Sequence, residues 1–312
     1  MEAVHLTLSE KTTERIDLLY ESAKRNGSLI SVHELTRLLS ERTSERELAE
    51  AIASDPLLNA RFELKGDYLT ERRPGPGASQ LSEESHSRRR ATSNLVHAVR
   101  FAQLLRPSRF RMVAASGSTS YGSASKSKDL DLFCVAPAGQ LWYSLTWGLI
   151  MARVFSFISS QSPPVCFSCV MDERFARSTF SDVQGPLFAR DALETKVIKG
   201  YDVHRSLMRM ARWISMFYPA AYELSEYSGT PVLTTNRPSV LERALNIFLF
   251  TTVGRYLKLK STLLNKKLAA ARRAWDVFDI QCEEDHLIYE SRRYVSLKQR
   301  YEEVLAATQI KA

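Results

Sequence analysis

The chain has 312 residues, of which 44% are hydrophobic and 25% are charged, the balance of a globular protein and not of a disordered or fibrous one. Its net charge of +8 is uneven: residues 1–70 carry 9 Lys and Arg against 13 Asp and Glu, a net charge of −4, so the remainder carries +12. A polyanion such as a nucleotide or a nucleic acid is therefore expected to meet the central or C-terminal part of the chain.

The N-terminal residues predict a small, mainly helical unit. Residues 10–25 have the apolar spacing of a helix. Two further helices are predicted to begin at capping boxes, in which a serine is followed three residues later by a glutamate, at Ser31 and Glu34 and at Ser44 and Glu47.

A predicted hairpin completes this unit, since residues 57–72 alternate between apolar and polar side chains around a Lys-Gly-Asp turn at Gly66. Three helices and a two-stranded wing resemble a winged helix, whose last helix enters the major groove of DNA. Here that helix, residues 44–54, carries one Arg and three Glu, a poor match to a phosphate backbone. We therefore expect residues 1–72 to form a winged-helix-like domain used for packing or protein contact, and not for sequence-specific DNA binding.

The next segment, residues 73–90, has the composition of a linker. It contains Pro-Gly-Pro-Gly at residues 74–77 and continues with Ser, Glu and Arg, so we expect a polar, flexible connection here. The three arginines at its end, Arg88–Arg90, are interpreted as the solvated start of a helix, with a phosphate contact as the alternative.

The central residues, 91–185, predict an α/β core. Three strand-like segments are predicted, at residues 111–116, 129–135 and 165–172. The helix predicted over residues 139–159 is the most apolar segment of the chain, but Arg153 interrupts it. Its uninterrupted apolar length falls short of a membrane span, so we expect a buried helix and no membrane association.

Four cysteines and an N-terminus without the pattern of a signal peptide predict a reducing compartment, and we expect a cytoplasmic protein. Cys166 and Cys169 form a lone C-x-x-C in the third strand-like segment, and no second pair completes a zinc site. Both are interpreted as core residues.

The last part, residues 186–312, is expected to form a C-terminal helical domain, including two helical segments over residues 262–309. Its basic residues are interpreted as a solvated helical face, with non-specific RNA binding or a cover over a bound nucleotide as alternatives. These residues are Lys258, Lys260, Lys266, Lys267, Arg272 and Arg273.

Two carboxylates, Asp129 and Asp131, lie in the second strand-like segment. Alternate residues of a strand share a face, so both side chains are expected to project together and to repel each other unless a cation lies between them. Hard divalent cations such as Mg²⁺ prefer such oxygen ligands. Gly117 and Ser118 end the preceding strand, where a glycine lets the backbone approach a phosphate and a serine offers its hydroxyl. A Walker A loop is excluded, because Ser-Ala follows Gly122 in place of Lys-Ser or Lys-Thr.

An apolar strand, Gly-Ser, ten residues and Asp-x-Asp in a second strand resemble the signature of the polymerase-β-like nucleotidyltransferases. An aromatic helix that starts near Leu141, an Asp-Glu pair after the Cys166 strand and residues 186–202 are similar to one uncharacterised prokaryotic subgroup of that family. The resemblance covers roughly residues 90–300. It implies a mixed α+β fold, in which a nucleotidyltransferase core lies between the winged-helix-like and helical domains.

The resemblance also implies the activity, which is transfer of a nucleoside monophosphate from a triphosphate to a hydroxyl group on RNA, a protein or a small molecule. Asp129 and Asp131 would hold two Mg²⁺ ions, with Mn²⁺ as an alternative. Gly117 and Ser118 would bind the phosphates. Two lysines are either nucleotide-binding residues or part of a solvated loop, namely Lys126 and Lys128.

Most members of the family have a third carboxylate on the adjacent strand. Alternation from Cys166 places Asp172 on the required face, so Asp172 is the predicted third catalytic acid and Glu173 the alternative. Ser168 stands in the middle of the strand, where the family's acid is common, so the third acid is absent in another interpretation. A nucleotide-binding pseudoenzyme and a nucleic-acid-binding regulator therefore remain as alternative functions.

Overall fold

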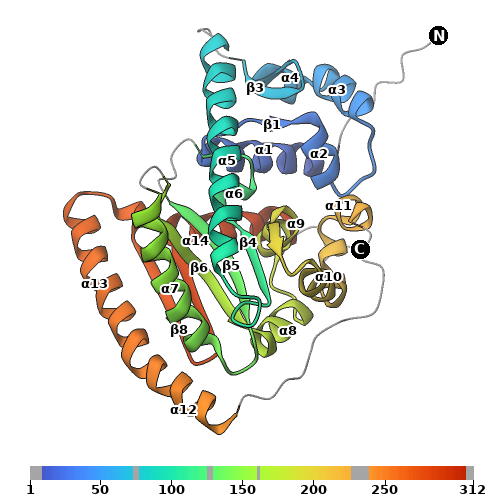
Figure 1. The fold of residues 1–312 in the computed structure, drawn as a ribbon. Coiled ribbons are helices and arrows are strands. Elements are labelled where there is room, and N and C mark those ends of the chain that lie inside the picture. The colour runs from blue at the N-terminus through green and yellow to red at the C-terminus, as the bar shows by residue number, and fades with distance from the viewer. Residues whose placement is uncertain (1–8, 73–76, 125–128, 160–161, 226–238, 307–312) are drawn as a thin grey trace.

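The computed structural model describes residues 9–72, 77–124, 129–159, 162–225 and 239–306, and it has the mixed helix and sheet composition expected of an α+β protein (Figure 1). A small N-terminal unit lies against a larger body built around one sheet of six strands. One hydrophobic core joins the N-terminal unit to one face of that sheet, and a second core lies on the opposite face.

The N-terminal unit follows the predicted order of helices and hairpin. Its elements are α1 (Glu10–Asn26), β1 (Ile30–Ser31), α2 (Val32–Leu38), α3 (Glu45–Ser54), α4 (Pro56–Arg61), β2 (Phe62–Lys65) and β3 (Tyr68–Glu71). Both capping boxes are confirmed, at Ser31 and at Ser44. Helix α4 was not expected: Asp55 ends α3 and also caps α4, since its side chain accepts hydrogen bonds from the backbone N–H groups of Leu57 and Leu58.

The expected linker is wrong from residue 77 onward, because α5 (Gly77–Leu104) is one long helix. Beyond Gly77 this segment contains neither Gly nor Pro, so no residue in it breaks a helix. Its sequence has little helical pattern of its own, and tertiary contacts stabilise the helix. Glu84 accepts a hydrogen bond of 2.8 Å from the backbone N–H of Leu29, and Arg88 pairs with Glu84 and lies over the ring of Tyr68. Arg88 therefore fastens α5 to the N-terminal unit. Residues 73–76 lie outside the described residues.

The central sheet has the order β7-β4-β5-β6-β9-β8. Strands β5 and β6 are parallel, and every other neighbouring pair is antiparallel. The three expected central strands are confirmed as β4 (Met112–Ala115), β5 (Leu130–Ala136) and β6 (Val165–Asp172). The other three are β7 (Lys196–Lys199), β8 (Phe278–Cys282) and β9 (His286–Ser291).

The purely helical description of residues 186–312 is therefore wrong. Strands β7, β8 and β9 all belong to the sheet that carries the central strands, and β8 and β9 form a hairpin within 278–291 where helices were expected. Apolar side chains alternate along β8, at Phe278, Ile280 and Cys282, which is the period of a strand. The turn that follows is Glu-Glu-Asp, without the Gly or Pro that usually marks a hairpin.

Helices cover both faces of the sheet. Helix α5 and helix α7 (Leu141–Ile158) pack on one face, where Leu130 and Leu132 of β5 belong to the core. The opposite face, which includes Phe133, packs against α8 (Glu173–Ser181), α9 (Pro186–Glu194) and α10 (Tyr201–Met210). The remaining α-helices are α6 (Gly117–Ser120), α11 (Pro219–Leu224), α12 (Val240–Leu249), α13 (Arg255–Ala270) and α14 (Arg292–Tyr301). Short 3₁₀ or π segments cover Arg212–Met216, Phe250–Gly254, Ala274–Asp276 and Glu302–Ala306.

Helix α7 has one face on the sheet. Gly148 brings its backbone close, since a Cβ atom there would lie 2.6 Å from Cζ of Phe167. Among the described helices, α7 alone has the length and apolar composition to cross a membrane, and core helices of soluble proteins pass the same test. Its buried side includes Trp142 and Leu145, whereas Phe157 at its end is exposed.

Candidate metal centre

Two carboxylates and a thiol meet at the end of strands β5 and β6. Ligand atoms of Asp129, Asp131 and Cys166 all lie within 4.8 Å of one another. Asp129 is exposed just before β5, while Asp131 and Cys166 are half-buried. The structure thus brings together the two aspartates that the sequence pairs. It adds Cys166, which is the register partner of Asp131 on the parallel strand.

The Gly-Ser turn packs directly on Asp131. Gly117 has a φ of +59°, in the left-handed region that favours glycine, and a Cβ atom there would lie 2.7 Å from Oδ2 of Asp131. The backbone N–H of Ser116 donates a 3.0 Å hydrogen bond to the carbonyl of Asp131. Glycine is therefore required by both the backbone angle and the neighbouring carboxylate.

Ser118 follows in α6, a single helical turn, and is half-buried. The turn is closed by the Ser120 hydroxyl, which donates to the carbonyl of Gly117 at 2.8 Å, and by the backbone N–H of Ser123, which donates to the carbonyl of Ser118 at 2.9 Å. The predicted nucleotide-binding lysines, Lys126 and Lys128, lie outside the described residues.

The electrostatics of the site favour a cation. Burial, and then the negative charge of Asp129, raise the pKa of Asp131 to about 7, and a hydrogen bond from the Cys166 thiol partly offsets this. Burial and the same two carboxylates raise the pKa of the Cys166 thiol, and Lys260 of α13 acts in the opposite direction. A divalent cation would relieve the repulsion between these groups.

Asp172 is not part of this site, so its predicted role as the third catalytic acid is wrong. It pairs with Ala136 at the far end of the strands, five residues from the pair of Asp131 and Cys166, which is about 16 Å along a strand. Its Oδ1 accepts hydrogen bonds from the backbone N–H groups of Arg174 and Phe175, and its Oδ2 accepts one of 2.8 Å from that of Gly139. Asp172 is a buried cap of α8.

Two features explain the error: Asp172 lies at the opposite end of the strand, and a register shift changes the face to which it belongs. Between its pairings with Asp131 and Phe133, strand β6 advances from Cys166 to Cys169, so it contains one extra residue. Simple alternation counted across this bulge assigns Asp172 to the wrong face. The alternative acid, Glu173, is also buried at that far end, with its Oε1 3.4 Å from Nε of Arg111.

On β6, Cys166 pairs with Asp131, and Ser168 lies within the bulge that follows. The Ser168 hydroxyl donates to the carbonyl of Leu132 at 3.2 Å and lies 3.2 Å from Oγ of Ser116, at the start of the Gly-Ser turn. The interpretation of Cys166 as a core residue is wrong, because its thiol faces the carboxylates. For Cys169 it is confirmed, since that residue packs against the core of the opposite face. Only the strand register distinguishes these two cysteines.

Residues far along the chain support the loop after α6. The hydroxyl of Tyr121 donates to Asp191 of α9, and the hydroxyl of Tyr294 donates to the other oxygen of the same carboxylate at 2.9 Å. Burial raises the pKa of Asp191, and these two hydrogen bonds act against that rise. No local motif in the sequence marks Asp191 as part of this support.

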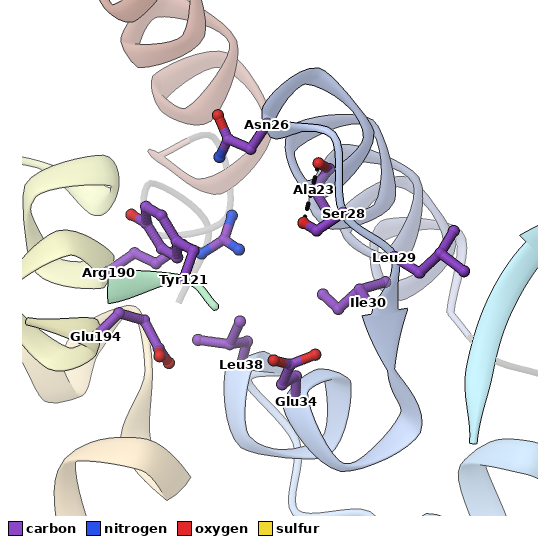
Figure 2. A pocket seen from close by; sticks show the side chains of 10 residues that line it. All are labelled: Ala23, Asn26, Ser28, Leu29, Ile30, Glu34, Leu38, Tyr121, Arg190 and Glu194. Carbon is purple, nitrogen blue, oxygen red and sulfur yellow. Dashed lines mark hydrogen bonds between the residues drawn. The ribbon is translucent and has the colours of Figure 1, made fainter. Parts of the chain in front are cut away.

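A small cavity lies beside this support and not at the carboxylates. Figure 2 shows Tyr121, Arg190 and Glu194 on one side of it and residues of the N-terminal unit, such as Asn26 and Glu34, on the other. Arg190 lies over the ring of Tyr121 and donates a 2.9 Å hydrogen bond to the hydroxyl of Ser22 in α1. The N-terminal unit therefore contacts the loop of the candidate site through Arg190.

The basic residues predicted as a solvated face on and after α13 are exposed, as expected. Lys260 differs from the others in that its charge acts on Cys166. Helix α13 packs beside β8, the edge strand of the sheet (Figure 1). Comparison with protein-family models, with curated proteins and with solved structures finds no match to this chain. The class of the protein is thus described by its fold and site alone: a mixed sheet that carries a glycine-dependent turn against a carboxylate pair.

Proposed function

We propose that this protein is a divalent-cation-dependent nucleotidyltransferase of the polymerase-β-like class, which transfers a nucleoside monophosphate from a triphosphate to a hydroxyl acceptor. One observation carries the proposal: the left-handed Gly117 packs on the carboxylate of Asp131, so a turn suited to phosphate and a carboxylate pair suited to a cation are in contact.

The residues present fit a divalent cation. Asp129 is accessible from solvent, Asp131 is close to it, and no Cβ atom from Gly117 fills the space beside the carboxylate. A bound Mg²⁺ or Mn²⁺ would neutralise the triphosphate and activate the acceptor hydroxyl. Asp129 and Asp131 would hold the cation, and Ser118 would offer its hydroxyl and the turn its N–H groups to the phosphates.

A second candidate, a nucleotide-binding protein with little or no transferase activity, is favoured by one specific observation. Among the described residues, the cluster of Asp129 and Asp131 contains a thiol, Cys166, and no third carboxylate. A missing acid would weaken activation of the acceptor while leaving the turn and the carboxylate pair able to bind a nucleotide.

The N-terminal unit gives little support to a third candidate, a DNA-binding regulator. The acidic side chains of α3 remain at its surface, where Glu50 pairs with Arg46 at 2.8 Å and Glu45 pairs with His33 at 2.7 Å. The one arginine of this helix is thereby engaged by a carboxylate. A helix of this charge is unfavourable in the major groove.

Transfer is tested by incubating the protein with each α-labelled nucleoside triphosphate, Mg²⁺ or Mn²⁺, and total RNA, followed by gel analysis. We expect label in RNA or in protein, and its loss in Asp129→Asn. The matched control is Asp279→Asn, which removes an exposed carboxylate from the edge strand β8 of the same sheet. Nucleotide binding by calorimetry without any label would favour the second candidate. Absence of both label and binding would overturn the proposal.

A further inference from the structure

The four cysteines have different environments, and Cys166 is the exception. Cys134 and Cys282 are buried in one hydrophobic core, and Cys169 packs against the other. Cys166 belongs to neither core, is half-buried, and faces two carboxylates. Cys169 is half-buried as well, but it packs against a core, whereas the Cys166 thiol faces charged groups, so packing alone does not account for Cys166.

Cys166 is positioned by the backbone. It is the register partner of Asp131 across two parallel strands, which places its thiol beside that carboxylate. Its sulfur and the carboxylate oxygens of Asp129 and Asp131 lie within 4.8 Å of one another, so the three groups can converge on one ion. The Cys166 sulfur therefore lies where a third ligand could bind the same cation as the two carboxylates.

The chemistry of sulfur changes which cations such a site prefers. Mg²⁺ takes oxygen ligands and keeps several waters, whereas Zn²⁺ and other borderline or soft cations bind thiolate well. Carboxylate oxygens and cysteine sulfur are both ligands of Zn²⁺, and three protein ligands leave its fourth position open.

We propose that Cys166 is the third ligand of the cation site formed with Asp129 and Asp131, and that this site binds Zn²⁺ and other thiophilic divalent cations more tightly than Mg²⁺. On binding, a sulfur–metal bond replaces the S–H bond and the proton passes to solvent, with no change of oxidation state. The inference rests on the proposed function only in that Asp129 and Asp131 bind a divalent cation.

The direct test is a titration of the full chain with Co²⁺, whose thiolate complexes show a sulfur-to-metal charge-transfer band. We expect this band in the unmodified protein and its loss in Cys166→Ser. The matched control is Cys169→Ser, which removes a sulfur three residues away on the same strand and should keep the band. The affinity for Zn²⁺, measured by competition with Co²⁺, should fall about tenfold or more in Cys166→Ser. Loss of an outer-shell partner of a metal ligand already reduces metal affinity by about that factor.

A complementary measurement begins with the native chain. Alkylation of Cys166 in the native chain, followed by peptide mass spectrometry, should be slowed by Zn²⁺ and unchanged by an excess of Mg²⁺. Cys166→Asp should reverse the preference, with weaker Zn²⁺ and stronger Mg²⁺ binding. A charge-transfer band that persists in Cys166→Ser, or equal alkylation with and without Zn²⁺, would overturn the inference.

The two proposals fail in different ways. If Mn²⁺ binding depends on Asp129 and Asp131 but Co²⁺ gives no sulfur band, the cysteine is not a ligand and the proposed function stands. If the sulfur band is present but neither nucleotide binding nor label transfer is found, the metal site stands and the proposed function is overturned.

Discussion

The two ends of strand β6 differ in how they treat acidic groups. At its carboxyl end, both oxygens of Asp172 accept hydrogen bonds from backbone N–H groups, and the side chain is buried. At its amino end, Asp131 is crowded by Asp129 and Cys166, and its pKa is raised. A fully hydrogen-bonded carboxylate stabilises the fold, whereas carboxylates that are buried close together and repel each other are suited to binding a cation.

The largest effect is expected from Asp131→Asn at the amino end. It removes one of the two charges that would hold the cation, so label transfer should fall by about 100-fold or more, the cost of losing one group that stabilises transition-state charge. The thermal midpoint should not fall, since the change also removes repulsion from Asp129. A loss of transfer that only follows a loss of folding, monitored by circular dichroism, would contradict this prediction.

Substitution of Gly117 should be the next most severe change, and the chain offers a matched control. Gly117 and Gly66 both have a φ of +59°, but a Cβ atom meets Asp131 at the first and nothing within 4 Å at the second. Gly66→Ala should cost about 1–2 kcal/mol of stability through the backbone angle alone. Gly117→Ala should add a loss of nucleotide affinity of about tenfold, or about 1.4 kcal/mol, measured by calorimetry. Equal nucleotide affinity in the two variants would show that the contact has no role in binding.

Asp172→Ala should have the opposite pattern to Asp131→Asn. Loss of the cap of α8 should lower the free energy of unfolding by about 1–2 kcal/mol, measured by urea denaturation. Below the unfolding transition, label transfer should remain within about twofold of the unmodified chain, because a side chain about 16 Å away along the strand does not reach the site. A selective loss of transfer in folded Asp172→Ala would return this residue to the active site.

The smallest effect expected is on the pH dependence of cation binding. The pKa of Asp131 is raised to about 7, so below that pH a cation must displace a proton from the folded protein. Mn²⁺ affinity should therefore increase with pH, by up to about tenfold per unit below pH 7, and level off above it. Asp131→Asn should remove this part of the slope in a calorimetric titration.

The Asp131 carboxyl should also affect folding stability. Cation affinity should increase with pH, whereas the stability of the cation-free protein should decrease with pH. Because its folded pKa lies above its unfolded value, the folded state binds more protons, and cation-free protein should lose stability as the pH rises from about 4 to about 7. Asp131→Asn should be less sensitive over that range. If the stability of the unmodified protein and of Asp131→Asn increased equally with pH over this range, the raised pKa of Asp131 would be contradicted.

Local patterns predicted the elements that depend on local physics. The capping boxes at Ser31 and Ser44 begin helices as expected, because a serine hydroxyl and a glutamate three residues later satisfy the first backbone N–H groups. Gly117 and the Asp129–Asp131 pair were also found from spacing, because alternation fixes the face of a strand over a few residues.

Features set by distant contacts were not predictable in this way. Residues 77–90 have a linker's composition, yet Arg88 and Glu84 fasten them as a helix to the N-terminal unit. The bulge in β6 has no sequence signal, and it separates Asp172 from the face that alternation gave it. Cys166 could be distinguished from Cys169 only by the strand register.

The position of β9 has a consequence for how this protein is made. Strand β9 lies between β6 and β8, although more than a hundred residues separate it from β6 along the chain. During synthesis on the ribosome, β6 therefore emerges early and has an open edge until residues 286–291 follow. A stalled or truncated chain would present that edge to other strands, a known route to aggregation. The strand that carries Cys166 of the candidate site therefore keeps one open edge until β9 has been made.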